Sequence, residues 1–368
     1  GIAESAAHSL IATKPVFELC RDLGVELVEP HKESNARYIV RNGGLRRFPL
    51  SVPEALSTLG RAAFVRSNNG NGQSLESWGR HHLGQPAVDY LLTPFVRGIY
   101  GAQPAELGVA AAFPSLKVPI GDTLLGAMLK KRFKGPKGPK ELKKRVAPKH
   151  GMGSLVNQLE RHLQVRLGSR FRKGVAVRWL PDAPNIIVAT PAYAAASLLE
   201  LDSPWLAQQL LTVRYTPIVS VTVFVDRRGF TRQVEGVGAL MPSCENRRCL
   251  GILFNSSSFD ERVTDQDKLA SFTVMMGGTN RSDWLAANDE QIEDAVRQEL
   301  KELLKIQDTL DMVIHRWPAA LPQYGLHLPS IWKEARGSWC ATPGRVLFGN
   351  YTGQISLRGM IESAAEIG

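Results

Sequence analysis

The stretch from residue 344 to residue 364 is the feature that most constrains the fold of this 368-residue chain. It reads GRVLFGNYTGQISLRGMIESA: a short β-type run from Arg345 to Phe348, a glycine–Asn–Tyr turn, and a segment with helical spacing. A strand that turns tightly into a helix brings backbone N–H groups close to a phosphate or an aromatic cofactor. NIIVATPAYAAASLLE at 185–200 has a similar strand–turn–helix pattern. The sequence therefore predicts an α/β fold with a candidate cofactor turn near its C-terminal end.

Strands and helices alternate irregularly elsewhere, which favours a mixed sheet with a helical insertion over a barrel or a bundle. An Asn-Gly pair flanked by alternating residues predicts a β-hairpin over 37–49. Further strands are predicted at 212–226 and 268–278, and amphipathic helices at 14–28 (running into a short strand), 153–168 and 288–306.

The length and the cysteines limit the class of protein. The chain is long enough to bury a large core, as one large domain or two intertwined ones. Its four cysteines form no CxxC pair, so disulfides and zinc are not expected and a reducing compartment is the simpler interpretation. No apolar run is long enough to span a bilayer, and no signal peptide is recognisable. The absence of an initiator Met indicates that the chain is not the complete gene product.

Most of the net charge of +10 lies in residues 130–149, where ten Lys and Arg face one acid, Glu141. One interpretation is a solvated loop, because the GPKGPK run opposes regular structure. The other is an electrostatic patch for anionic lipid headgroups or for a substrate that carries carboxylates. Nucleic acid is not favoured as a partner, because Phe133 is the only aromatic residue within the basic run.

Motifs that would identify a function are missing from the chain. It has no GxGxxG dinucleotide fingerprint, P-loop, GxSxG elbow or HExxH motif, and GNG at 70–72 reads as a polar turn. The eight histidines show no metal-ligand spacing, so no metal site is predicted. Taken alone, the residues indicate an α/β protein with one candidate cofactor turn.

Several blocks in order resemble the protoporphyrinogen oxidases, an FAD-dependent family of the flavin amine-oxidase superfamily. The blocks are ARYIVRNGGLRRFP (36–49), the run from SLESW to AFPSL (74–116), NIIVATPAYAAASLL (185–199), GVGALMPSCENRRCLGILFNSSSF (236–259), HRWPAALPQY (315–324) and GNYTGQISL (349–357). The resemblance implies a mixed α/β fold: an FAD/NAD(P)-binding Rossmann-like domain that lacks its first βαβ unit, a substrate-binding mixed sheet, and a helical membrane-associated subdomain.

The resemblance also implies a division of the chain into three parts. Residues 1–36, 150–200 and 340–368 would belong to the FAD-binding domain, 37–50 and 201–339 to the substrate-binding domain, and 51–149 to the helical subdomain with the basic loop 130–149.

Three groups of residues match the positions at which the family contacts its ligands. Arg37 matches an arginine that pairs with a porphyrinogen propionate, and its planar fork suits a carboxylate. Val237, Gly238 and Leu240 match the segment that packs the tetrapyrrole against the flavin. The segment whose backbone meets the flavin corresponds to Gly349, Asn350, Tyr351, Ile355, Ser356 and Leu357. Each group has a structural alternative. The arginine could simply be exposed on a hairpin, the second segment could serve ordinary strand packing, and the third could be a plain strand–turn–helix joint.

The implied activity is FAD-dependent oxidation of protoporphyrinogen IX or coproporphyrinogen III to the porphyrin, with O2 as acceptor, in haem biosynthesis. No catalytic side chain is predicted, because the cofactor carries the redox chemistry and the protein orients the substrate. The predicted location is cytoplasmic and peripheral, on an inner or organellar membrane, with 130–149 facing anionic lipid. A homodimer is compatible with the sequence.

Departures from the family pattern leave alternatives open. The N-terminal GxGxxG unit is not in the chain, Ala6 and His8 stand where the family has glycine and where it can have arginine, and Gln354 replaces a glycine of the flavin-facing turn. One alternative is a flavin-free relative that binds porphyrin without catalysis. Another is an oxidoreductase of the superfamily that acts on a polyamine or a carotenoid, although Arg37 would repel a cationic substrate.

Overall fold

The computed structural model describes residues 1–368 apart from 69–71, 135–143, 231–233 and 368. Its largest sheet is a seven-stranded mixed sheet with the order β11-β7-β10-β9-β8-β3-β4. Among these described strands, β3 and β8 run parallel, and the other neighbouring pairs run antiparallel. The strands are β3 (Arg37–Arg41), β4 (Gly44–Arg46), β7 (Tyr215–Asp226), β8 (Gly238–Leu240), β9 (Cys249–Phe254), β10 (Leu269–Gly277) and β11 (Asp311–Pro322).

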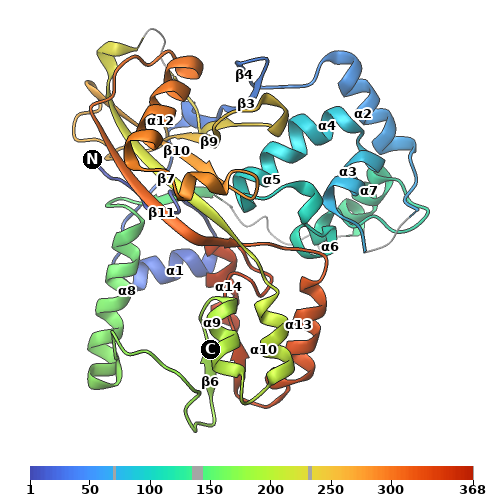
Figure 1. The fold of residues 1–368 in the computed structure, drawn as a ribbon, viewed down its shortest axis with the longest axis vertical. Helices are drawn as coiled ribbons and strands as arrows, with labels where there is room; N and C mark the ends of the chain where they lie inside the picture. The colour runs from blue at the N-terminus through green and yellow to red at the C-terminus, as the bar shows by residue number, and fades with distance from the viewer. Residues whose placement is uncertain (69–71, 135–143, 231–233, 368) are drawn as a thin grey trace.

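This sheet has an apolar face and a polar face, because residue types alternate along its central strands. Val221 and Val223 of β7 are fully buried in a cluster with α12 (Asp289–Leu304), which lies beside β7 and β10 in Figure 1. Successive side chains of a strand point to opposite faces, so Ser220 and Thr222 lie on the face away from α12. The polar face is the side of the sheet on which Arg37, Gly238 and Leu240 lie.

Helices between β4 and β5 form a second part, at the right of Figure 1. They are α2 (Val52–Phe64), α3 (Leu75–His82), α4 (Gln85–Ala87), α5 (Thr93–Tyr100), α6 (Val109–Ala112) and α7 (Leu124–Lys134), with a π-helical turn at Val88–Leu92. Their hydrophobic core is continuous with that of the third part of the molecule. Within the described residues, no helix combines the length and the apolar character that crossing a bilayer requires.

The third part, below the sheet in Figure 1, contains the two strand–turn–helix units. Its elements are β6 (Ile186–Val188), α9 (Ala192–Leu199), α10 (Pro204–Leu211), α13 (Leu328–Gly337), β12 (Arg345–Leu347) and α14 (Leu357–Ile367). β6 and β12 pair in parallel. A separate three-stranded sheet, β1-β5-β2, packs with two helices; these elements are β1 (Leu10–Ala12), β2 (Leu27–Val28), β5 (Lys144–Pro148), α1 (Lys14–Asp22) and α8 (Met152–Leu167).

The local predictions are confirmed where they rest on a turn motif or on helical periodicity in the sequence. The hairpin turns at Asn42 and Gly43, which adopt φ of 53° and 69°, as a two-residue loop of this kind requires. The predicted strands correspond to β7 and β10, and the predicted helices to α1, α8 and α12. The strand–turn–helix pattern of the C-terminal stretch is confirmed by β12 and α14.

The prediction of a loop over 130–149 is wrong at both ends. The segment begins inside α7 and ends in β5, while residues 135–143 lie outside the described part. Lysine and arginine are good helix formers, and the apolar Val146 and Ala147 are buried where β5 pairs with β1 and β2. The division into three parts at the stated boundaries stays a prediction; β5, at the end of 51–149, pairs with strands of 1–36.

Candidate functional site

The turn after β12 is held in place by a glycine and a close backbone contact. The N–H of Phe348 donates to the carbonyl of Val188 at 2.9 Å, which continues the parallel pairing of β12 with β6. Gly349 has a φ of 157°. A Cβ at Gly349 would lie 2.9 Å from the Tyr351 ring and 3.5 Å from the carbonyl oxygen of Thr190. The two strand–turn–helix units therefore meet at this glycine.

Two aromatic side chains fix the backbone of the turn. The hydroxyl of Tyr324 donates to the carbonyl of Asn350 at 2.6 Å, and the indole N–H of Trp332 donates to the carbonyl of Tyr351 at 2.7 Å. The rings of Tyr324 and Trp332 pack edge to face with centroids 5.8 Å apart, and Tyr351 is only 1% exposed. Burial raises the pKa of Tyr324, so its hydroxyl stays protonated and remains a donor at neutral pH.

The residues that follow the turn begin helix α14. Ile355 packs against the core shared with the helical part, and Leu357 packs against the core of the three-stranded sheet. Ser356 Oγ accepts a hydrogen bond from the N–H of Gly359 at 3.1 Å. A Cβ on Gly359 would collide with the side-chain oxygen of Gln354, so Gln354 lies over the first turn of α14. The predicted contacts of Ile355, Ser356 and Leu357 with flavin stay predictions.

The residues around Gly349 fit the flavin end of an FAD molecule. Thr190 Oγ1 and the hydroxyl of Tyr351 are buried, and neither has a hydrogen-bond partner among the described residues. Buried polar atoms are normally satisfied, so such atoms indicate a missing ligand or water. The first N–H groups of a helix such as α14 also lack partners within the helix and favour electron-rich groups. The side chain of Gln354, which lies over the first turn of α14, narrows the space at this turn.

The predicted substrate residues lie together on the sheet, away from the turn. Arg37 pairs in register with Gly238, and both lie on the polar face. A Cβ on Gly238 would collide with the carbonyl oxygen of Ile252, so close approach of β9 explains this glycine without a ligand. Leu240 lies against α5, because a Cβ on Gly98 would be 2.7 Å from its Cδ2.

Val237 precedes β8 and is half-buried. Its N–H donates to the carbonyl of Ala36 at 2.8 Å, and its carbonyl accepts from the N–H of Phe254 at 3.0 Å. These bonds join β3, β8 and β9 at the point where Arg37 begins its strand. Substrate contacts of Val237, Gly238 and Leu240 stay predictions.

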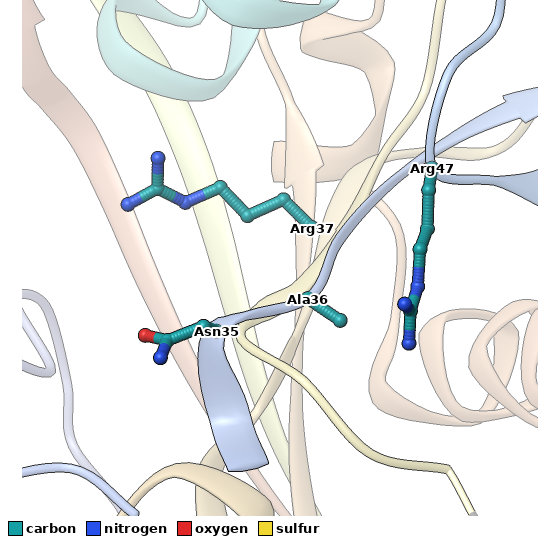
Figure 2. A pocket seen from close by; sticks show the side chains of 4 residues that line it. All are labelled: Asn35, Ala36, Arg37 and Arg47. Atoms are coloured by element: carbon teal, nitrogen blue, oxygen red, sulfur yellow. The ribbon is translucent and has the colours of Figure 1, made fainter. Parts of the chain in front are cut away.

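A hollow of 490 Å³ opens beside Arg37 and is lined by Asn35, Ala36, Arg37 and Arg47. Figure 2 shows the side chains of Asn35 and Arg37 extending to one side of the chain, with Arg47 on the other. Arg37 is exposed, and no carboxylate in the described part of the chain forms an ion pair with it. The hollow is wide open and positively charged, which suits an anionic group entering from solvent.

Polar side chains fill the centre of the polar face, and sequence reasoning missed them. Thr222 and Thr273 are 3.3 Å apart, and Asn255 Nδ2 donates to Thr273 Oγ1 at 2.9 Å. Ser220 Oγ and Ser271 Oγ are fully buried and have no hydrogen-bond partner within the described structure. The available signal was serine and threonine at every second position of otherwise apolar strands, IVSVTVFV and LASFTVMM.

The N-terminal segment lies across this face. The indole N–H of Trp317 donates to the carbonyl of Ser5 at 2.7 Å. Glu4 accepts from the N–H of Met152 at 2.7 Å and lies 3.6 Å from the guanidinium of Arg262. Burial, which is the larger cause, and the charge of Arg262 lower the pKa of His8 to about 4. His8 is therefore a neutral imidazole at physiological pH.

Metal ligation has no structural candidate in the described residues: no group of three or more His, Cys, Asp or Glu side chains is arranged to hold an ion.

Comparison with known proteins extends the resemblance to the whole chain. The family model for flavin containing amine oxidoreductases matches residues 2–368. The chain is 25% identical to the chloroplastic protoporphyrinogen oxidase of Oryza sativa subsp. japonica, over 99% of this chain and 77% of that protein. It is 26% identical to the mitochondrial protoporphyrinogen oxidase of Nicotiana tabacum, over 88% and 75% of the two chains. The resemblance to protoporphyrinogen oxidases is thereby confirmed.

Solved structures agree in fold. A crystal structure from Exiguobacterium sp. 255-15 superposes with a TM-score of 0.73 at 16% identity, covering 100% of this chain and 90% of that chain. Cyclohexylamine oxidase from Brevibacterium oxydans IH-35A superposes with a TM-score of 0.62 at 16% identity, covering 98% of this chain and 87% of that chain. The predicted mixed α/β fold with a multi-stranded sheet is confirmed. The chain belongs to the flavin-containing amine oxidoreductase family.

Proposed function

We propose that this protein is an oxygen-dependent flavoenzyme that oxidises a porphyrinogen, protoporphyrinogen IX or coproporphyrinogen III, to the porphyrin. When bound, FAD, the cofactor of the family, would supply the two-electron oxidising chemistry, with O2 as the final acceptor. The observation that carries the proposal is the match, over 99% of the chain, to plant proteins named protoporphyrinogen oxidases.

The geometry supports this proposal through two features. Exposed Arg37, at the positively charged hollow, suits a propionate carboxylate, because a guanidinium offers two parallel N–H donors. Around Gly349, the aromatic anchors Tyr324 and Trp332 hold the backbone rigid for the flavin end of FAD. In this arrangement the side chains bind and orient the substrate.

The proposal includes peripheral binding to a membrane surface. None of the residues of α2 is buried, and α2 and α7, which contact each other, expose large apolar side chains near the exposed Lys130 and Lys131 of α7. These side chains are Val52, Leu56, Leu59 and Phe64 on α2, and Leu125, Met128, Leu129 and Phe133 on α7. Apolar side chains bordered by lysine suit an interface with anionic lipid. Replacing Leu56 and Leu59 together by serine should reduce cosedimentation with phosphatidylserine vesicles without changing the flavin spectrum.

The test of the enzymatic proposal is turnover by the native holoprotein. Protoporphyrinogen IX and coproporphyrinogen III are supplied aerobically, and the appearance of fluorescent porphyrin is followed together with flavin absorbance. The expected result is flavin-dependent porphyrin formation that falls when Arg37 is replaced by Gln. A yellow protein that oxidises an amine such as putrescine but neither porphyrinogen would refute the proposal and support another substrate class of the family.

A further inference from the structure

Arg145, in β5, is a half-buried cation held by neutral groups. Its guanidinium donates to Ser34 Oγ at 3.3 Å and to Ser258 Oγ at 3.5 Å. The guanidinium carbon lies 5.1 Å from the centre of the Phe259 ring. Hydroxyls and a ring face hold the group in position but do not neutralise its charge.

Two neighbouring cations, Lys144 and Arg262, have acidic partners, whereas Arg145 has none among the described residues. Lys144, the preceding residue of β5, lies 2.7 Å from a carboxylate oxygen of Glu29. Arg262 contacts the same phenylalanine ring as Arg145, at 5.4 Å, and lies 3.6 Å from Glu4. No ion pair joins Arg145 to a carboxylate within the described residues. A partly buried charge without a counter-ion is costly, so this position fits an anion from outside the chain.

Arg145 also contacts both segments that carry the candidate substrate residues. Ser34, one of its hydroxyl partners, is 1% exposed and precedes Arg37 by three residues. The other partner, Ser258, donates to the carbonyl of Gly236 at 3.4 Å, two residues before Gly238. The pKa of Arg145 is lowered, mainly by burial and additionally by the charge of Arg37. The positive charge of Arg37 therefore disfavours the charged form of Arg145, and an anion bound beside Arg145 would offset that effect.

We propose that Arg145 and Arg37 together bind the propionate carboxylates of the substrate, with Arg145 as the deeper group and Arg37 as the exposed one. This inference rests on the proposed function, because it takes the ligand to be a porphyrinogen. It adds a specificity-determining residue that the family resemblance did not supply. A substrate whose propionates are esterified leaves both charges unneutralised, so the pair selects free acids over esters.

The test compares binding of the product porphyrin as free acid and as dimethyl ester. Protoporphyrin IX and its dimethyl ester are titrated into holoprotein, and the shift of the porphyrin absorption band gives each Kd. Arg145→Gln should weaken binding of the acid about 10- to 100-fold, the range expected for loss of a charge-assisted bond, and leave the ester unchanged. Arg145→Lys keeps the charge but not the planar guanidinium, so its Kd for the acid should lie between those of wild type and Arg145→Gln. Lys144→Gln, which removes a charge already paired with Glu29, should behave as wild type.

Three results would overturn the inference. The first is wild-type protein that binds acid and ester equally, and the second is Arg145→Gln protein that still prefers the acid as wild type does. A structural role would instead lower the midpoint of urea unfolding and weaken both ligands alike, and it would also overturn the inference. Turnover is recorded separately. If the holoprotein oxidises no porphyrinogen, the proposed function is refuted. If Arg145→Gln nevertheless removes the preference for the free acid, the carboxylate site is still supported.

Discussion

Replacing Tyr324 by phenylalanine tests whether the turn at 349–351 is the flavin-contacting backbone. The substitution keeps the ring and its packing on Trp332 but removes the hydroxyl that donates to the carbonyl of Asn350 at 2.6 Å. A neutral hydrogen bond contributes about 1 kcal/mol net, and leaving a partly buried carbonyl without its donor costs about 1 kcal/mol more. We expect the free energy of unfolding to fall by about 2 kcal/mol.

The same change should weaken FAD binding, because the freed carbonyl lets the turn adopt backbone positions that do not match the flavin. If the substitution makes the free energy of FAD binding about 1.4 kcal/mol less favourable, the Kd for FAD rises about tenfold. The Kd is measured by titrating FAD into deflavinated native protein and following the quenching of flavin fluorescence. The free energy of unfolding is taken from urea titrations of the same samples.

Tyr100→Phe is the matched control. The Tyr100 ring packs on the Tyr324 ring with centroids 5.4 Å apart, and its hydroxyl donates to the carbonyl of Ala112 at 3.1 Å, within the helical part. This variant should lose similar stability without weakening FAD binding. Equal effects of the two variants on the Kd for FAD, or no effect of either, would refute the assignment of the turn.

Three further predictions concern other residues. Glu299→Ala should lower the free energy of unfolding by about 2–3 kcal/mol in urea titrations, because Arg247, 2.8 Å away and 14% exposed, keeps only Glu302 as an acidic partner among the described residues, and the N–H of Arg248 loses its acceptor. The lowered pKa of His8 means that the unfolded chain binds more protons between pH 4 and 6.5, so stability should fall as pH drops through that window, and less steeply in His8→Asn. Gln354→Gly should lower the Kd for FAD by opening the first turn of α14, whereas an unchanged Kd would show that Gln354 does not obstruct the flavin.

Sequence reasoning succeeded where the cause of the structure is local. Asn42-Gly43 determines a hairpin turn by its own backbone preferences, and the glycine before Asn350 marks the turn after β12 in the same way. It failed for the ends of the basic segment, because burial of Val146 between β1 and β2 depends on chain far from it in sequence. The hydrogen bond from Tyr324 to Asn350 was equally out of reach, since only the fold brings these residues together.

The motif blocks identified the family, but they gave no physical reason for individual residues. Gly238 was predicted to admit a ligand ring, and the structure explains it by the carbonyl of Ile252 on the adjacent strand. Arg145 was counted only as one charge of a basic run, although its hydroxyl partners and its lack of a described carboxylate partner distinguish it from Lys144. A charge count cannot separate a neutralised lysine from a half-buried arginine that still needs an anion.

The contrast between the two faces of the large sheet indicates which one serves function. The face under α12 is lined mainly by buried apolar side chains, which help to hold the strands in register. The opposite face keeps Ser220 and Ser271 fully buried and unpartnered within the described structure, although valine or alanine there would avoid the cost of an unsatisfied hydroxyl. Because stability alone would disfavour such residues, their position on the face that also carries Arg37 favours contact with a ligand or with ordered water.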